Sequence, residues 1–285
     1  MDYENCRLCP RQCGVDRTRG QRGFCGCGDK ALVAKTMLHM WEEPALAGSG
    51  GSGAIFFGGC SLKCRYCQNR DISRGATGAE TDAAGLRKLM EDLIAQGAEN
   101  IDLVTPTHFL PTVLPALTPK LPVPVVYNCG GYETAETVRA LAGKADIFLP
   151  DMKYADNKLA EELSGAPDYF ETASRAITEM EKAAGSIRRN GEKVIGGVII
   201  RHLILPGHVE NSLRVLDWIG QTFAPGQVLV SLMRQYTPMP GLLPPLDRCV
   251  TQREYEAVLS WMYLNRLDGF VQEAPSADKV FIPDF

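Results

Sequence analysis

The chain lacks long apolar runs, an excess of basic residues and an export-type leader. No hydrophobic stretch approaches the ~18 residues that a membrane span needs. The 30 basic and 34 acidic residues give a net charge of −4, so there is no positive surplus for non-specific binding to nucleic acid. The opening residues Met1–Asn5 are acidic and polar, unlike a signal peptide. We therefore expect a cytoplasmic protein with neither membrane nor nucleic-acid partners.

The composition is that of a soluble globular protein. Hydrophobic residues make up 45% and charged residues 22% of the 285 positions. This length suits one large α/β domain or two small ones. The sequence has no internal repeat of the solenoid kind, so the fold has to come from the local order of apolar and polar residues.

The cysteines are concentrated at one end of the chain. Eight of the ten precede residue 68, and residues 1–30, rich in Gly, Arg and Cys, have the character of a loop held by a metal. The Gly/Ser run at residues 48–53 is expected to be a flexible connector. This divides the chain into a Cys-rich N-terminal extension, residues 1–47, and a main domain, residues 48–285. Without an export signal, we expect reduced, metal-binding thiols.

From residue 54 onward, short β-type runs alternate with stretches of helical period, which predicts βαβ units and a parallel sheet. The expected strands lie at residues 54–57, 101–104, 123–127, 147–149, 195–203, 228–232 and 269–272. The expected helices lie at residues 82–96, 134–142, 168–184, 210–223 and 252–264, with Thr81-Asp82 and Asn211-Ser212 as candidate N-caps. About six such units make an α/β fold of the partial (β/α)6 TIM-like barrel type, whose working loops follow the strands.

The most informative motif is a cysteine triplet directly after the first of these strands. Cys60, Cys64 and Cys67 have the spacing C-x3-C-x2-C and follow Gly58-Gly59. Three thiolates at this spacing can hold three corners of a [4Fe–4S] cluster, which leaves the fourth iron open, whereas an electron-transfer cluster has four cysteine ligands. A zinc site would need a nearby fourth ligand, which is absent, and a disulfide framework would need an oxidising compartment.

These residues also carry a family resemblance. The pattern C-x3-C-x-aromatic-C resembles the signature of the radical S-adenosylmethionine (SAM) superfamily, and the continuation Gln68-Asn69-Arg70-Asp71-Ile72-Ser73 resembles its pyruvate formate-lyase-activating-enzyme-like branch. The resemblance implies that SAM binds the open iron through its amino and carboxylate groups. It also implies reductive cleavage of SAM to a 5′-deoxyadenosyl radical, which abstracts hydrogen from a substrate. The electron would come from an external donor such as flavodoxin or ferredoxin.

Tyr66, Thr105 and Thr107 are candidates for contacts to SAM. Tyr66 lies between two triplet cysteines, where an aromatic ring can stack on adenine or pack under the loop. Thr105 and Thr107 follow the second strand, where relatives in the resembled family often have a Gly-Gly-Glu segment for the SAM amino group. This sequence lacks that segment, so the threonine hydroxyls or the backbone carbonyls are expected to replace it; the alternative is a plain helix start.

Later strand ends supply the remaining candidates. Asn128 follows the third strand and offers both a donor and an acceptor to a ribose or amino-acid group. Asp151 and Lys153 follow the fourth and resemble the Asp-x-Lys segment that contacts SAM in glycyl-radical activases, although a surface ion pair is the alternative. Arg201 and His202 end the fifth strand; an arginine can bind a carboxylate through two nitrogens, and the imidazole can donate a hydrogen bond to SAM.

A second constellation of cysteines lies in the front of the chain. Cys6, Cys9, Cys13 and Cys25 resemble an N-terminal extension found in one activase-like subgroup, and Cys27 could replace Cys25. They are expected to bind zinc as a folding staple or a second, closed Fe–S cluster as an electron relay, with disulfides as a third option. The spacing does not decide between these.

The functional hypothesis is an enzyme that cleaves SAM and acts on a protein or peptide. Activation of a glycyl-radical enzyme is one possible outcome, and another radical modification is an equal alternative. The alternative from a different class is a non-catalytic iron–sulfur or zinc protein that transfers electrons or binds partners.

Overall fold

Seven parallel strands form the middle of one large mixed sheet. The computed structural model describes residues 1–272. The strand order is β10-β9-β8-β6-β5-β4-β2-β1-β3, with β1 and β3 antiparallel at one end and β7 paired to β8. The parallel strands are β2 (Ser52–Phe57), β4 (Asn100–Val104), β5 (Val125–Cys129), β6 (Ile147–Pro150), β8 (Lys193–Leu203), β9 (Val228–Met233) and β10 (Gly269–Val271). The predicted α/β class and parallel sheet are confirmed, but the order has two free ends, so the described strands do not close into a barrel.

Three strands were not predicted from the sequence. They are β1 (Ala31–His39), β3 (Ala79–Thr81) and β7 (Arg188–Asn190). Although β1 falls in the segment assigned to the extension, it pairs with β2 along most of its length. The sheet therefore runs across the boundary at residues 47 and 48.

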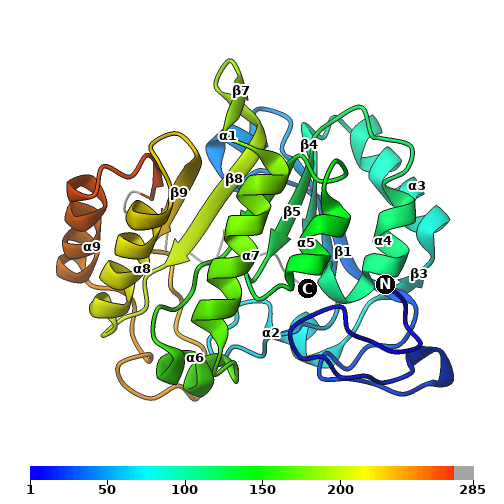
Figure 1. Cartoon of the computed structure of the whole chain (residues 1–285), viewed down its shortest axis with the longest axis horizontal. Coiled ribbons are helices and arrows are strands. Elements are labelled where there is room, and N and C mark those ends of the chain that lie inside the picture. Colours follow the sequence, from blue (N-terminus) through cyan, green and yellow to red (C-terminus); the bar gives the residue numbers. More distant parts are fainter. Residues whose placement is uncertain (273–285) are drawn as a thin grey trace.

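Helices connect the parallel strands, and Figure 1 shows several of them in front of the sheet. They are α2 (Arg70–Gly75), α3 (Ala83–Ala95), α4 (Leu110–Ala116), α5 (Ala135–Leu141), α6 (Asn157–Ser164), α7 (Tyr169–Ala184), α8 (Val209–Thr222) and α9 (Gln252–Leu264), with single turns η1 (Arg17–Arg19) and η2 (Thr107–Phe109). The cap on α3 is confirmed, because the Asp82 side chain accepts from Gly85 N–H. In the described part of the chain, no helix is long and apolar enough to cross a bilayer.

The predicted cap at Asn211-Ser212 is wrong. Helix α8 already begins at Val209, and both side chains lie buried within it. Asn211 Oδ1 accepts from Ala155 N–H at 2.8 Å, and Ser212 bonds His202. Their polar groups therefore fasten the helix to the strand ends, a long-range role that a local cap pattern does not reveal.

Both faces of the parallel strands are buried. Side chains such as Leu103 and Tyr127 pack under the helices in the main core. Alternate positions, such as Val126 and Ile199, belong to a second apolar cluster with Leu46 of α1 (Pro44–Ala47). Because successive strand residues point to opposite faces, α1 covers the face of the sheet opposite the large helices. We call this the inner face.

The glycine-rich run at residues 48–53 is not a flexible connector. Ser52 and Gly53 are already part of β2, and Gly51 to Gly53 are buried. A Cβ atom at Gly50 would lie 2.4 Å from the Gly97 carbonyl oxygen. The glycines therefore let the chain pass close to neighbouring backbone behind α1. In the sequence, a glycine run with this role looks the same as a flexible linker.

The N-terminal loops are tied to the main domain by two arginines. Arg11 donates to the carbonyl oxygens of Ser61, Ser164 and Gly165. Arg17, which is 1% exposed, donates to the His108 carbonyl at 2.6 Å. Figure 1 places these dark-blue loops beside α2 and β3. The expected loop character of residues 1–30 agrees with the described structure, in which η1 is their one helical turn.

The packing of α1 against the sheet can be tested through its effect on stability. Replacing Leu46, which is 2% exposed, by alanine should lower the free energy of unfolding by about 2–5 kcal/mol, because it leaves a cavity against the inner face. Leu264→Ala, at a leucine 73% exposed, is the matched control and should change it by under about 0.5 kcal/mol. Urea titration measures both. Equal effects would contradict the packing of α1 on the sheet.

Candidate functional site

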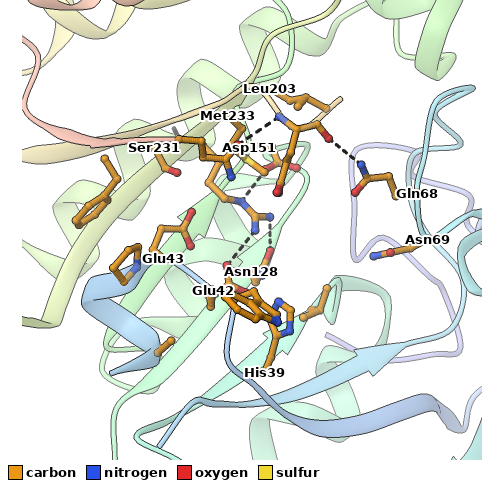
Figure 2. A pocket seen from close by; sticks show the side chains of 18 of the residues that line it. His39, Glu42, Glu43, Gln68, Asn69, Asn128, Asp151, Leu203, Ser231 and Met233 are labelled. Carbon is orange, nitrogen blue, oxygen red and sulfur yellow. Dashed lines mark hydrogen bonds and ion pairs between the residues drawn. The ribbon is translucent and has the colours of Figure 1, made fainter. Parts of the chain in front are cut away.

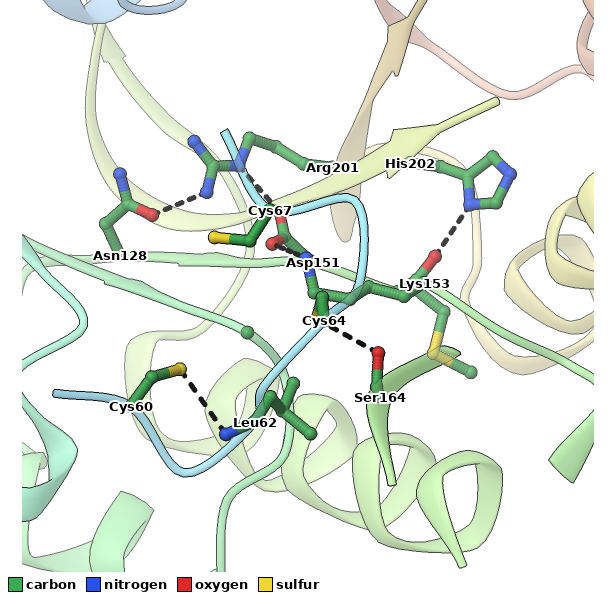
Figure 3. A network of polar contacts seen from close by, with 12 residues as sticks. Cys60, Leu62, Cys64, Cys67, Asn128, Asp151, Lys153, Ser164, Arg201 and His202 are labelled. Atoms are coloured by element: carbon green, nitrogen blue, oxygen red, sulfur yellow. Dashed lines mark hydrogen bonds and ion pairs between the residues drawn. The ribbon is translucent and has the colours of Figure 1, made fainter. Parts of the chain in front are cut away.

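The three triplet cysteines share one loop between β2 and α2 (Figure 3). Each sulfur accepts a hydrogen bond: Cys60 from Leu62 N–H at 3.3 Å, Cys64 from Ser164 Oγ at 3.0 Å and Cys67 from Ser73 Oγ at 3.6 Å. Burial raises the pKa of the Cys60 thiol, and the neighbouring Cys64 and Cys67 raise it further. The three sulfurs therefore lie close enough to interact and are surrounded by donors that stabilise thiolate.

Glycines allow this loop to leave the strand. Gly59 has φ +81°, and a Cβ atom there would lie 2.3 Å from the Cys27 sulfur. At Gly58 a Cβ atom would lie 2.1 Å from the Thr77 carbonyl oxygen. Only glycine fits where the loop passes so close to other backbone and to the front cysteines.

The donor set fits a [4Fe–4S] cluster better than a single metal ion. In residues 1–272 no three His, Cys, Asp or Glu side chains converge closely enough to hold one ion. Three thiolates on separate corners, each with its own hydrogen-bond donor, are what a cluster with one open iron requires. The chemistry of the three residues thus matches the prediction, and Cys60, Cys64 and Cys67 are the residues that would hold the cluster.

A polar network at the next strand ends lies beside this loop. Asp151 and Arg201 form a parallel bridge between the ends of β6 and β8, and their side chains bond at 2.9 Å. Lys153 Nζ donates to the other Asp151 oxygen at 2.5 Å. Arg201 also donates to Asn128 Oδ1 at 2.5 Å. Figure 3 shows the four side chains next to Cys64 and Cys67, so the structure brings together four of the predicted residues.

The charges in this network support one another. Burial raises the pKa of Asp151, but Arg201 and Lys153 outweigh it and hold that pKa below its usual range. Burial lowers the pKa of Lys153, but Asp151 and then Cys64 outweigh it, so the pKa is raised. All three groups stay ionised at neutral pH. The ammonium beside Cys64 also favours an anionic ligand or thiolate there.

A pocket of about 870 Å³ opens over this network. Figure 2 shows the side chains around it, with Gln68 and Asn69 on one side and Glu42 and Glu43 on the other. Its walls include two of the three triplet cysteines and the strand-end groups: Cys64, Cys67, Asn128, Asp151, Lys153 and Arg201. This size is within the range of small-molecule and cofactor sites.

Three predicted residues do not line this pocket. Thr107 Oγ1 donates to Glu133 at 2.7 Å within a buried cluster that includes Tyr127. The ring of His202 is fully buried: Nδ1 donates to the Met152 carbonyl at 2.6 Å, and Nε2 accepts from Ser212. Burial lowers the pKa of His202 to about 4, so it is neutral. Thr105 has φ +61° and contributes its backbone N–H to the Asn128 carbonyl.

Tyr66 lies at the pocket wall but is 6% exposed. Its hydroxyl bonds the Tyr154 hydroxyl at 2.7 Å, which in turn bonds Ser164, the donor to Cys64. The packing role anticipated for this ring is therefore present, and stacking on adenine stays a prediction.

The sequence did not indicate an acidic group at the far side of the pocket. Glu42 and Glu43 follow β1, and Asp102 lies in β4 with its side chain fully buried. Burial raises the pKa of Glu42 to about 7, of Glu43 to about 8 and of Asp102 to about 6. The one signal in the sequence was Asp102, an acidic residue inside the apolar strand at residues 101–104. Burying a charge there costs free energy unless the charge has a partner.

The front cysteines are mostly buried but do not converge on one ion among the described residues. Burial raises the pKa of the Cys9 thiol to about 12, and the nearby Glu133, Cys25 and Cys13 add smaller increases. Cys27 donates to the Gly58 carbonyl at 3.4 Å, next to the cluster loop. The second metal site, with Cys6, Cys9, Cys13 and Cys25 as ligands, stays a prediction.

One family model and one curated relative match the chain. The model, a 4Fe-4S single cluster domain, aligns with residues 46–110, which include the cluster loop. An uncharacterized protein of Methanocaldococcus jannaschii, MJ0674, is 30% identical over 278 residues, covering 93% of this chain and 76% of that protein. The chain belongs to the same family as this protein.

Solved structures with the same fold are radical SAM enzymes. A radical SAM methyltransferase from Sphaerobacter thermophilus has a TM-score of 0.55 at 11% identity, covering 79% of this chain and 68% of that one. SuiB of Streptococcus suis, bound to the precursor peptide SuiA, has a TM-score of 0.52 at 15% identity. The match covers 76% of this chain and 47% of SuiB, so the chain spans about half of SuiB. These structures confirm the predicted fold; the activating-enzyme-like branch stays a prediction.

The raised pKa of Glu43 gives a pH test. A carboxyl group whose pKa rises from 4.5 unfolded to about 8 folded costs stability progressively as pH increases between those values. Glu43→Gln does not titrate, so its free energy of unfolding relative to wild type should increase over that window. Leu264→Ala, at an exposed position that does not titrate, is the control and should show a pH-independent difference. Urea titrations across pH decide, and a pH-independent difference for Glu43→Gln would contradict the assignment.

Proposed function

We propose that this chain, as a member of that family with the radical SAM fold, reductively cleaves SAM and uses the resulting radical on a protein or peptide. The observation that carries the proposal is that Cys64 and Cys67 open into the same pocket as Asn128, Asp151 and Lys153. A ligand on the open iron would meet an ammonium, an amide and a carboxylate, the groups that complement an amino acid.

A cluster held by Cys60, Cys64 and Cys67 would supply the one electron needed to break a C–S bond of the SAM sulfonium, giving methionine and a 5′-deoxyadenosyl radical. The residues of the chain hold and shield these groups. Cys60, Cys64 and Cys67 bind the irons, and Ser164 and Ser73 keep their sulfurs in place by hydrogen bonds. Lys153 offers its ammonium to a carboxylate at the strand ends. Apolar pocket walls such as Phe56, Leu203 and Phe270 shield the radical from water.

The substrate class is the finer part of the proposal. SuiB, with the same fold, was solved with a precursor peptide. The pocket here also extends well beyond the cysteine loop, to Glu43 and Phe270, which leaves room for a substrate side chain next to SAM. The electron would come from a flavodoxin or ferredoxin. Activation of a glycyl-radical enzyme is one reaction within this class.

Anaerobic reconstitution with iron, sulfide, SAM and dithionite tests SAM cleavage. Wild type and Cys249→Ala, which removes an exposed cysteine outside the site, should produce 5′-deoxyadenosine. Cys64→Ala should lose the cluster and the product, because a cluster held by two cysteines is incomplete. If the fully loaded wild type makes no more product than Cys64→Ala, the enzyme proposal fails and the non-catalytic iron–sulfur protein remains.

The front cysteines are proposed as a second metal centre. Arg17 is buried, and its guanidinium lies 3.9 Å from the Cys6 sulfur. A buried cation favours thiolates around it, and thiolates favour metal. The spacing still allows zinc or a second cluster.

Metal analysis separates these two outcomes. With Cys60, Cys64 and Cys67 all replaced by alanine, the protein should retain either about one zinc or about four irons per chain. Adding Cys13→Ala to that variant should release the metal. A triple variant that binds neither metal, while remaining folded by circular dichroism, would show that the front cysteines are not ligands.

A further inference from the structure

The far side of the pocket contains more acid than the structure neutralises. Two cations, Arg201 and Lys153, face four carboxyl groups, those of Asp151, Glu42, Glu43 and Asp102. Asp151 forms ion pairs with both of these cations. We call the remaining three carboxyl groups the acidic floor. Among the described residues, the one cation near all three of them is Arg201.

Arg201 cannot satisfy the acidic floor because its nitrogens are already engaged. Nε bonds Asp151, and one terminal nitrogen bonds Asn128. The other lies 3.6 Å from Glu42, too long for a strong bond. The side-chain amide of Asn128 donates a hydrogen bond to Asp102 at 3.2 Å. Glu43 therefore has no cation of its own.

Two floor oxygens are left without a partner although they are buried. Glu43 is 8% exposed, and its Oε2 atom has no hydrogen-bond partner; Asp102 Oδ1 is in the same state. Buried acceptors without partners are rare in folded proteins and costly. Glu43 lines the pocket, and Figure 2 shows its carboxyl group among the side chains around it. His39, whose Nδ1 is also unpartnered, faces the same space.

The floor is distinct from the place where SAM would meet the cluster. The charges that act on Glu42 and Glu43 are each other, Asp102 and Arg201, with no cysteine among them. Lys153 and Asp151, in contrast, interact with Cys64. In Figure 2 Glu42 and Glu43 lie across the pocket from Gln68 and Asn69, which continue the cluster loop.

The walls next to the floor are apolar. Phe56, Trp41, Met40 and Phe270 line the pocket with the two glutamates. An occupant that matches both features has an apolar stem and a positively charged end. A bare metal ion does not fit, because no three ligand groups in residues 1–272 converge on one point.

We propose that the acidic floor binds an ammonium or guanidinium group on an apolar stem, as in a lysine or arginine side chain of the substrate. The assignment to a substrate rests on the proposed function; the cation site itself does not. A cation placed here gives Glu43 Oε2 the partner it lacks and balances the negative charge that Glu42 and Glu43 acquire when they release their protons. Binding also selects against neutral side chains, since they leave the floor unpaired.

The proposal includes a pH dependence. Glu43 is faced by Glu42 on its own loop, His39 from β1, Asp102 from β4 and Arg201 from β8. The raised carboxyl pKa values, about 7 for Glu42 and about 8 for Glu43, mean that the floor holds protons at neutral pH. A cation competes with those protons, so its binding should strengthen as pH rises through this range.

The probe is n-butylammonium, an analogue of the lysine side chain, with 1-butanol as its neutral counterpart. Calorimetric titration into the full-length protein without SAM should show n-butylammonium binding at least about tenfold tighter than 1-butanol. The double variant Glu42→Gln/Glu43→Gln should lose this preference. Asp92→Asn, at an exposed helical ion pair, should keep it. Circular dichroism and urea titration confirm that each variant is folded.

Two results would overturn the proposal. One is equal binding of the cation and the alcohol to wild type. The other is a double variant whose SAM affinity, measured on the reconstituted protein, falls as much as its cation affinity, which would assign the floor to SAM. Because these are binding measurements, they are independent of 5′-deoxyadenosine production. Failure of SAM cleavage alone would thus leave the cation site standing.

Discussion

The pocket depends on the parallel pairing of β6 with β8, which places Asp151 beside Arg201. These two groups and Lys153 are partly buried, and each is ionised because the others are present. Removing Asp151 would leave two cations facing each other in a poorly solvated space, while removing Arg201 would leave the acidic floor without its shared cation. One register between two strands therefore sets the charge of both ends of the cavity.

Much of this could be predicted from the sequence, because the relevant signals are local. Each parallel strand is a short apolar run, and the triplet Cys60, Cys64 and Cys67 has a spacing that few other sites share. Asn128, Asp151 and Arg201 were found because the carboxyl ends of parallel strands meet at one edge. Position at a strand end thus identified the residues that could reach the site.

The rest of the site could not be predicted from the sequence, because it depends on the direction in which each side chain points and on partners that are distant in the sequence. His202 and Arg201 are adjacent, yet alternation along β8 sends one to the core beside Ser212 and the other into the pocket. Thr107 similarly faces Glu133. Glu42 and Glu43 carry no motif; they enter the site only because the chain crosses the inner face of the sheet before β2, a path that no local pattern encodes.

Arg11 connects parts of the molecule that the sequence separates. Its guanidinium binds the carbonyl of Ser61, next to Cys60, and that of Ser164, whose hydroxyl bonds Cys64. Whatever orders the front loops therefore also orders the surroundings of two cluster ligands. If the front cysteines bind metal as proposed, thermodynamic reciprocity makes filling of either centre favour filling of the other, and a chain without its front metal would be a poorer acceptor for its cluster.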